Sequence, residues 1–404
     1  MRLRNDTGHL SYSTLVHASD TWEELRYSIS TYVPKVKELV CPDSCFGVSL
    51  RLSGASAERL AKDDVARREL ARILEEDDLY VYTVNAFPHG SFKRTRVKER
   101  VYEPDWLSEE RVRYTEQVAD LLAIITRNDI EPSIQSAPLA FRPAVRDHDY
   151  VAGMAENVLR VIAHLTALHH RTDRVVTLAL EPEPFCYLET TDETIQFFDE
   201  YIRTPASIAR LAELTGLDEG GAEVSLRRHL GVVFDIGHQS VGFEDPAVSL
   251  AKFRQADIPI FKLQEAAALW IPEVNQAAIE ELERYARSIY LTQTTELSQG
   301  VKRQYLNLED AIENWISEPR PAEWRVHFHV PVFLDELGPF RSTRFAIEEA
   351  LAMHRATPLS THLEIETYTW DVLPAHLKTG DIVEYVAREL EWVIGELEAS
   401  TPAL

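Results

Sequence analysis

Cysteine is scarce in this chain: its 404 residues include only three, Cys41, Cys45 and Cys186. That number is too small for a disulfide framework. Cys41 and Cys45 stand in CPDSC, and no second cysteine or histidine pair follows at zinc-finger spacing. We therefore interpret both as free thiols near a loop rather than as parts of a metal clip.

Long hydrophobic runs are missing as well. The N-terminal stretch MRLRNDTGHLSY has no apolar segment of the kind that a signal peptide needs. The longest apolar runs, such as VADLLAII, are far shorter than a membrane-spanning helix. We therefore expect a soluble cytoplasmic protein with no membrane insertion.

Positive charge is in deficit. The chain has 42 Lys and Arg against 66 Asp and Glu, which gives a formal net charge of −24. Such a field repels phosphate backbones and anionic membrane surfaces, so nucleic-acid partners are disfavoured. The partner class that remains is a small molecule, and the oligomeric state stays open, a homo-oligomer included.

Several common catalytic and nucleotide-binding motifs are absent from the sequence, namely GxGxxG, GxxxxGK[ST], GxSxG and HExxH. The sequence therefore lacks the motifs that identify a dinucleotide-binding protein, a P-loop protein, a serine hydrolase or a zincin.

What the chain does contain is an alternation of short strand-like segments with long amphipathic ones. The predicted strands are residues 10–17, 46–53, 79–87, 133–139, 175–181, 231–237, 258–264, 325–333 and 362–369. Helical periodicity lies between them, for example over 21–40 and 149–170. Repeated β-α units imply a parallel sheet with right-handed crossovers.

The fold class that we predict is α/β, a (β/α)8 TIM barrel formed by a single domain over residues 1–404. Because nine strands are one too many for such a barrel, we assign about 265 to 333 to an elaboration around the seventh βα connection.

Alternation within the strands indicates which side chains point into the barrel. The set that shares the inward face is polar and comprises Glu181, Lys262, Gln264, His327, His329, Glu364 and Glu366. An antiparallel sheet with one solvated face would give the same alternation. The intervening helices favour the barrel, because they require an apolar outer face. Polar residues at the C-terminal ends of barrel strands are where such folds keep their chemistry.

Strand ends supply candidate metal ligands. In FDIGHQS, Asp235 ends a strand and His238 follows across a glycine turn, and this mixture of oxygen and nitrogen suits a divalent cation. The alternative is that Asp235 caps the next helix and His238 lies on the surface. Glu181 in LALEPEP and Glu366 in LEIETYT end two further strands, unless they are simply solvated. Together the four residues predict a site for a divalent metal ion: Mn, Mg, Zn or Co.

Further side chains are candidates for contacts with a metal or a substrate. The pair in HFHVP contributes His329 as a metal ligand and His327 as a substrate contact, unless both are hydrogen-bonded residues that line the barrel. Lys262 either offsets the carboxylate charge, stabilises a developing oxyanion or forms a structural salt bridge. The other candidates for substrate binding are His17, Arg51, Asn85, His89 and Gln264.

The segments LALEPEP, FDIGHQ and LEIETYTWDVLP resemble the xylose-isomerase-like TIM barrels of the sugar phosphate isomerase/epimerase superfamily. More closely, RTRVKERVYEPDW, RRHLGVVFDIGHQSVGFEDP, WRVHFHVPVFL and HLEIETYTWDVLP resemble the EboE metabolite-traffic family. The resemblance covers most of the chain, from the first strand to near residue 375.

This resemblance implies a (β/α)8 barrel with a divalent metal at its C-terminal mouth. Glu181, Asp235, His238 and Glu366 fall where the superfamily places metal ligands or catalytic acids. Members of the superfamily commonly have a histidine ligand at the end of the strand that corresponds to IFKLQEA, where this chain has Lys262 and Gln264. His329 is the residue that we expect to substitute for it.

The predicted function is a metal-dependent isomerase or epimerase that acts on a sugar- or cyclitol-like polyol in a metabolite biosynthesis or trafficking pathway. Glu181 and Glu366 would exchange a proton through an enediolate, Lys262 would steady the negative charge, and the metal would acidify the substrate C–H. Two alternatives stay open. One is a metal-dependent hydrolase of the phosphodiester-cleaving kind, which needs a multi-metal cluster with more histidines. The other is a non-catalytic metabolite-binding barrel.

Overall fold

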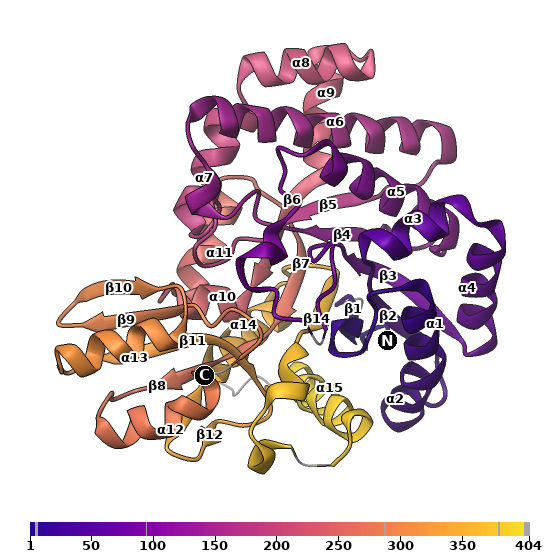
Figure 1. The fold of residues 1–404 in the computed structure, drawn as a ribbon. Coiled ribbons are helices and arrows are strands. Elements are labelled where there is room, and N and C mark those ends of the chain that lie inside the picture. The colour runs from indigo at the N-terminus through magenta and orange to yellow at the C-terminus, as the bar shows by residue number, and fades with distance from the viewer. Residues whose placement is uncertain (5–6, 94, 287, 379, 400–404) are drawn as a thin grey trace.

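Eight parallel strands form the centre of the computed structural model, which describes residues 1–4, 7–93, 95–286, 288–378 and 380–399. The strands are β1 (His9–Tyr12), β2 (Phe46–Arg51), β3 (Leu79–Asn85), β4 (Ser133–Ser136), β5 (Thr177–Leu180), β6 (Leu230–Asp235), β7 (Ile260–Glu265) and β14 (His362–Ile365). Their order is β1-β14-β7-β6-β5-β4-β3-β2, and every adjacent pair is parallel. A parallel bridge between Ser13 and Ser49 brings β1 and β2 together. The predicted (β/α)8 barrel is therefore confirmed (Figure 1).

Every segment predicted as a strand overlaps an observed strand. The observed strands are shorter than the predicted segments, because the polar residues that follow most of them already belong to the loops of the barrel mouth. The segment 325–333 is the one that lies outside the barrel, since it contains most of β11 (Glu323–Val330), which belongs to a second sheet.

Between β7 and β14 the chain adds this second sheet, which is antiparallel and drawn in orange in Figure 1. Besides β11 it contains β8 (Ala267–Ile271), β9 (Thr294–Ser298), β10 (Val301–Tyr305), β12 (Glu336–Leu337) and β13 (Phe340–Ser342). The pairing of β11 with β8 shifts register between Val326 and His329, which is a β-bulge. Bulges re-aim side chains and are frequent beside active sites.

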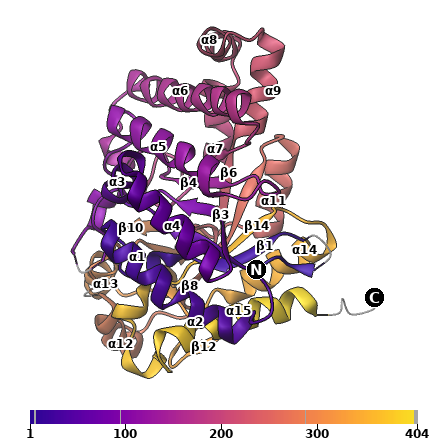
Figure 2. The ribbon, with the colours of Figure 1, turned by 90° about the vertical axis from the view of Figure 1, so that its right-hand side faces the viewer.

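Helices surround the barrel (Figure 2). They are α1 (Trp22–Thr31), α2 (Val33–Val40), α3 (Gly54–Lys62), α4 (Asp64–Glu76), α5 (Glu109–Ile125), α6 (His148–Thr172), α7 (Thr191–Phe197), α8 (Pro205–Thr215), α9 (Glu219–His229), α10 (Ile236–Val241), α11 (Pro246–Gln255), α12 (Gln276–Ala286), α13 (Leu308–Ser317), α14 (Arg344–Ala356) and α15 (Ile382–Glu398). Thr190 and Glu193 form a capping box ahead of α7. The helix predicted over 21–40 is divided into α1 and α2, with Pro34 in the first turn of α2.

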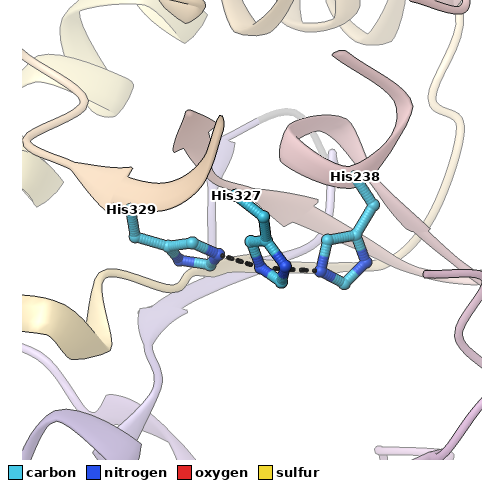
Figure 3. Close-up of side chains that lie close together, drawn as sticks. All are labelled: His238, His327 and His329. Carbon is cyan, nitrogen blue, oxygen red and sulfur yellow. Dashed lines mark hydrogen bonds between the residues drawn. The ribbon is translucent and has the colours of Figure 1, made fainter. Parts of the chain in front are cut away.

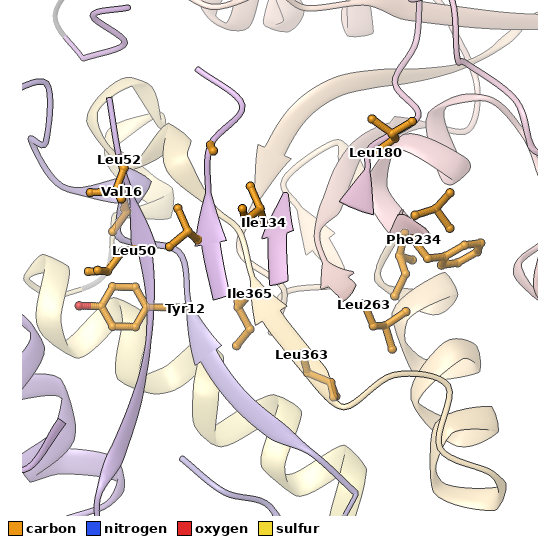
Figure 4. Close-up of a cluster of buried hydrophobic side chains, with 14 of the residues drawn as sticks. Tyr12, Val16, Leu50, Leu52, Ile134, Leu180, Phe234, Leu263, Leu363 and Ile365 are labelled. Carbon is orange, nitrogen blue, oxygen red and sulfur yellow. The ribbon is translucent and has the colours of Figure 1, made fainter. Parts of the chain in front are cut away.

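The outer faces of the barrel strands are apolar and pack against the helices. Figure 4 shows these side chains on the strands or just beyond them: Tyr12, Val16, Leu50, Leu52, Ile134, Leu180, Phe234, Leu263, Leu363 and Ile365. The alternate residues point inward, and among them Lys262, Gln264 and Glu364 are 0% exposed. Because these polar groups are removed from water, they must find partners in one another.

Helix α6 has the length and composition of a membrane-spanning helix, with a mean hydropathy of 1.2 in its most apolar window. The prediction that every apolar segment is too short to span a bilayer is therefore wrong for this helix. In the fold, 61% of that window is buried, and α6 packs against α5, α8 and α9 (Figure 1). That degree of burial is typical of a core helix.

Candidate active site

Four polar side chains from neighbouring strands converge at the C-terminal mouth of the barrel. Asp235 ends β6, Gln264 lies near the end of β7, and Glu181 and Glu366 directly follow β5 and β14. The register pairs Asp235 with Gln264, and Gln264 with Glu364. All four are buried, with at most 5% exposure. Parallel pairing thus brings three carboxyl groups from three strands around one amide.

The amide nitrogen of Gln264 lies between these carboxyl groups. Its Nε2 donates to Oε1 of Glu181 at 3.0 Å, to Oδ2 of Asp235 at 2.5 Å and to Oε2 of Glu366 at 2.9 Å. An amide has two N–H protons, so three acceptors compete for them. The other amide atom, Oε1, is buried and has no hydrogen-bond partner among the described residues. We call Glu181, Asp235, Gln264 and Glu366 the carboxylate site.

The carboxylate site has the composition of a site for a hard divalent cation. Rotation about the terminal torsion of Gln264 exchanges Nε2 and Oε1, so the same side chain can offer a donor to the carboxylates or an oxygen to a cation. Three carboxylates and one amide oxygen are ligands that Mg²⁺ and Mn²⁺ accept. The buried oxygen without a partner and the excess of negative charge therefore both fit a bound cation.

Electrostatics point the same way. Burial, and after it the negative charges of Glu366 and Asp235, raises the pKa of Glu181 well above its usual range. Burial and the charge of Glu364 do the same to the pKa of Glu366. Three buried carboxyl groups so close together cannot all ionise unless a cation compensates them, so either a proton or a metal ion must be held here.

Lys262 does not reach the pocket above these carboxyl groups. It is fully buried, its Nζ lies 2.5 Å from Oε1 of Glu364, and it donates to Oε1 of Gln135. Gln135 in turn donates from Nε2 to Oε2 of Glu181 at 2.6 Å. The structure thus supports the salt-bridge interpretation of Lys262, and that it steadies charge on a substrate stays a prediction. It positions Glu181 through Gln135.

A narrow pocket opens above the carboxylate site, lined by Glu181 and Glu366, with a cavity volume of about 50 Å³. Phe92, Tyr290 and Tyr368 line the same pocket and pack against one another, with ring centroids 4.9 to 5.2 Å apart. Ligand pockets usually measure about 300 to 1,000 Å³. A sugar-sized ligand therefore requires these aromatic rings to move.

Beside the carboxylate site, three histidine rings lie in a row (Figure 3). His238 lies on α10, whereas His327 and His329 lie on β11 of the inserted sheet. Nε2 of His327 is 3.2 Å from Nε2 of His238 and 3.1 Å from Nε2 of His329. We call His238, His327 and His329 the histidine cluster. Among the described residues, two groups of three His, Asp or Glu side chains have ligand atoms within 4.8 Å of one another: this cluster, and the set Glu181, Asp235 and His238.

Both interpretations of Asp235 hold at once. Its Oδ1 accepts the backbone N–H of His238 at 2.9 Å and so caps α10, while its Oδ2 faces Gln264. The alternative that placed His238 on the surface is wrong, because this side chain is 5% exposed and its Nε2 lies 3.5 Å from Oδ2 of Asp235.

Burial also keeps two of the histidines neutral. It lowers the pKa of His329 to about 4 and that of His327 well below its ordinary value, and the nearby histidines add to the effect on His327. Neutral imidazoles carry a lone pair on one ring nitrogen, which is the form that binds metals.

Among the predicted substrate contacts, Asn85, Gln264 and His327 lie at this site. Asn85 donates from Nδ2 to Oε1 of Glu366 at 2.8 Å, and both Asn85 and His327 line the pocket. The other predicted contacts lie elsewhere.

His17 stacks on Tyr32 with centroids 4.4 Å apart and lines a different groove. His89 packs against Tyr114 outside the pocket. Arg51 is fully buried and its guanidinium donates to the backbone carbonyls of Ser19, Pro88 and Gly90. The structure therefore does not bring His17, Arg51 and His89 to this pocket, since aromatic rings contact the two histidines and loop carbonyls and Asp20 bind the guanidinium of Arg51.

Two further residues lie beside the pocket: Glu183, which the sequence offers as a candidate for a substrate contact, and Gln293, which sequence reasoning missed. Glu183 lines the pocket, accepts from the hydroxyl of Tyr102 at 2.7 Å and from Nε2 of Gln293 at 3.1 Å, and its Oε2 has no partner among the described residues. The spacing of Glu181 and Glu183 in LEPEP is a signal for Glu183. Gln293 carries no such signal, because the inserted sheet brings it here.

Comparisons with known proteins found similar solved structures. No family model matches the chain, and no curated protein matches it. Among solved structures, the chain is similar to a xylose isomerase-like TIM barrel protein from Mycobacterium smegmatis in complex with magnesium, at 13% identity and a TM-score of 0.49 over 97% of each chain.

It is also similar to an L-ribulose 3-epimerase, at 14% identity and a TM-score of 0.48 over 97% of this chain and 95% of that one. A third is an IOLI protein with a zinc atom, at 11% identity and a TM-score of 0.49 over 97% of this chain and all (100%) of that one. These similarities concern the fold, which the strand order establishes independently.

Proposed function

We propose that this protein is a divalent-metal-dependent isomerase or epimerase that acts on a sugar- or cyclitol-like polyol. The observation that carries the proposal is the convergence of Glu181, Asp235 and Glu366 on the amide of Gln264 at the mouth of the barrel. A pocket directly above them, lined by two of these carboxyl groups, supports a small-molecule substrate. The pathway and membership of the EboE family remain predictions.

The residues that would hold the metal are Glu181, Asp235, Glu366 and Gln264, with His238 adjacent. A bound divalent cation would polarise a substrate carbonyl and acidify the neighbouring C–H. The carboxyl group of Asp235 would be held in place for this role, because its Oδ1 accepts the backbone N–H of His238 at 2.9 Å.

Glu181 and Glu366 are the proposed proton-transfer groups. Both line the pocket, so each can reach a substrate C–H there. Gln135 fixes Oε2 of Glu181 at 2.6 Å, and Asn85 fixes Oε1 of Glu366 at 2.8 Å. One group, as the carboxylate, would take the proton from carbon to give an enediolate, and the other, as the carboxylic acid, would deliver its own proton, either to the opposite face of the same carbon (epimerisation) or to the neighbouring carbon (isomerisation).

Exchange of substrate hydrogen with solvent tests the proposal. Chelator-treated protein is reloaded with Mg²⁺ or Mn²⁺ and incubated in D₂O with a panel of ketoses, aldoses and inososes, and deuterium incorporation is followed by mass spectrometry. We expect exchange in the wild type and at least about a 100-fold loss in Glu181→Gln and in Glu366→Gln. Glu213→Gln, on the exposed face of α8, is the matched control and should keep the wild-type rate. Equal rates in all four proteins would overturn the assignment.

Metal-assisted hydrolysis is the second candidate, and the histidine cluster favours it, since hydrolytic barrels need more than one metal ion. Phosphodiester or phosphomonoester cleavage by the reloaded protein, without deuterium exchange into any polyol, would select this reaction. Asp235→Asn should abolish isomerisation and hydrolysis alike. The two reactions are therefore distinguished by the product that the wild type forms, and not by this variant.

A further inference from the structure

The hydrogen bonds of the histidine cluster fix the proton on the same nitrogen in each ring. Nδ1 of His238 donates to the carbonyl oxygen of Pro182 at 3.0 Å, and Nδ1 of His329 donates to the carbonyl oxygen of Glu366. Nδ1 of His327 donates to Oε1 of Gln293 at 3.0 Å. A carbonyl oxygen can only accept, so each Nδ1 carries the proton and each neutral ring has its lone pair on Nε2.

The orientation of Gln293 is itself determined. Its Nε2 lies 3.1 Å from the carboxylate oxygen of Glu183 and 3.4 Å from the carbonyl oxygen of Pro184, and both of these atoms only accept. The opposite end of the amide, which faces His327, must therefore be its oxygen. All three rings are thus held by acceptors behind them, the arrangement that orients metal-binding histidines.

The three lone pairs point at one another. Nε2 of His327 lies within 3.2 Å of both other Nε2 atoms, and in Figure 3 it sits between them. One proton cannot satisfy three such nitrogens, but a metal ion can. Three imidazole ligands around a tetrahedral ion at about 2.0 to 2.1 Å are separated by about 3.4 Å. The two separations that involve His327 are within a few tenths of an ångström of that value, and the ligand atoms of His238 and His329 lie within 4.8 Å of each other, so a small movement of the outer rings would bring all three to one ion.

We propose that His238, His327 and His329 form a second cation site, which takes a transition metal of the zinc class and is distinct from the carboxylate site. Imidazole nitrogen selects Zn²⁺, Co²⁺ or Cu²⁺, whereas the oxygen ligands of the carboxylate site select Mg²⁺ or Mn²⁺. The carboxylate nearest to the cluster is Asp235, whose Oδ2 lies 3.5 Å from Nε2 of His238. Asp235 therefore lies between the two sites and is the shared neighbour of both ions.

Two segments of the chain build this second site together. His238 belongs to the barrel, and the other two histidines belong to the inserted sheet. His238 and His327 line the pocket, so the remaining coordination position of the ion would face a ligand there. The inference does not depend on which reaction the protein catalyses.

Cobalt spectroscopy on the full-length chain tests the inference. Chelator-treated protein is titrated with Co²⁺ in the presence of excess Mg²⁺, and visible absorption and metal content are measured. We expect one Co²⁺ per chain with the intense d–d bands of a tetrahedral, nitrogen-rich site. His329→Ala and His238→Gln should each weaken Co²⁺ binding at least about 100-fold. His170→Gln, at the exposed end of α6, should bind Co²⁺ as the wild type does.

Each result has a fixed meaning. The inference would be overturned if the wild type lacked the tetrahedral bands, or if a folded His238→Gln or His329→Ala protein kept them. If both variants fail to fold, the wild-type spectrum alone decides. Co²⁺ bound at the histidines in a protein without deuterium exchange would count against the proposed function alone. Exchange without a histidine-bound ion would count against this inference alone.

Discussion

Replacing Gln264 by Glu tests the carboxylate site without any assay of activity. The substitution keeps the size of the side chain but exchanges the donor that three carboxyl groups share for a fourth negative charge. Two N–H protons are lost, and a hydrogen bond to a charged group contributes about 1.5 to 3 kcal/mol. In chelated protein near neutral pH, the free energy of unfolding should therefore fall by about 3 to 6 kcal/mol.

A cation should reverse that loss. Four carboxylates bind a divalent ion more strongly than three carboxylates and an amide, and a ligand of the folded state stabilises it by RT ln(1 + [L]/Kd). Saturating Mn²⁺ should thus raise the stability of Gln264→Glu by several kcal/mol more than that of the wild type. The comparison is made by urea unfolding in chelator and in Mn²⁺, followed by circular dichroism.

Gln196→Glu, on an exposed turn of α7, is the matched control and should change stability by less than about 0.5 kcal/mol in either buffer. If Gln264→Glu is as stable as the wild type in chelator, or gains no more from Mn²⁺ than the wild type does, then these four side chains do not form a cation site.

Three other substitutions have defined outcomes. Burial raises the pKa of Glu389 to about 8 from an ordinary 4.5, so the folded wild type loses stability as the pH rises between these values. Glu389→Gln should remove that slope and stabilise the protein by about 3 kcal/mol at pH 7, measured by urea unfolding from pH 5 to 8. Lys262→Met leaves the charge of Glu364 buried alone and should cost about 3 to 5 kcal/mol, and adding Glu364→Gln should restore most of it. Tyr290→Ala should widen the pocket and lower the KM for bulky polyols in the exchange assay, at a cost in stability of about 3 to 5 kcal/mol for the lost aromatic packing; an unchanged KM in the folded variant would show that this ring does not limit access.

The sequence predicts the barrel and its carboxyl groups because both depend on local alternation. A strand that is apolar on one face and polar on the other must put its polar face inside once helices cover the sheet. That argument places Glu181, Asp235 and Glu366 correctly at one mouth, since the ends of parallel strands meet there.

Contacts made by long side chains and by the insertion could not be predicted in this way. Arg51 has the inward parity of a ligand, but its guanidinium is taken up by loop carbonyls that no strand pattern reveals. Strand alternation predicts the inward position of Gln264, but it does not predict that the amide of this side chain lies between three carboxyl groups. His327 and His329 share a face by spacing, yet the partner that they meet, His238, lies 89 residues from His327 along the chain.

Because β11 is bulged, the histidine cluster depends on the number of residues in this strand as well as on the two histidines themselves. Between Val326 and His329 the strand contains more residues than its partner β8, and the two histidines lie in that stretch. Regular pairing would require the loss of two residues there, whereas deletion of Phe328 alone would make the two histidines consecutive and turn one imidazole to the opposite face of the sheet. Relatives that keep both histidines but differ by one residue in this stretch would therefore lack the cluster, and an alignment scored by identity alone would group them with this chain. Insertions and deletions in β11, rather than substitutions, are the changes that separate proteins with this arrangement from those without it.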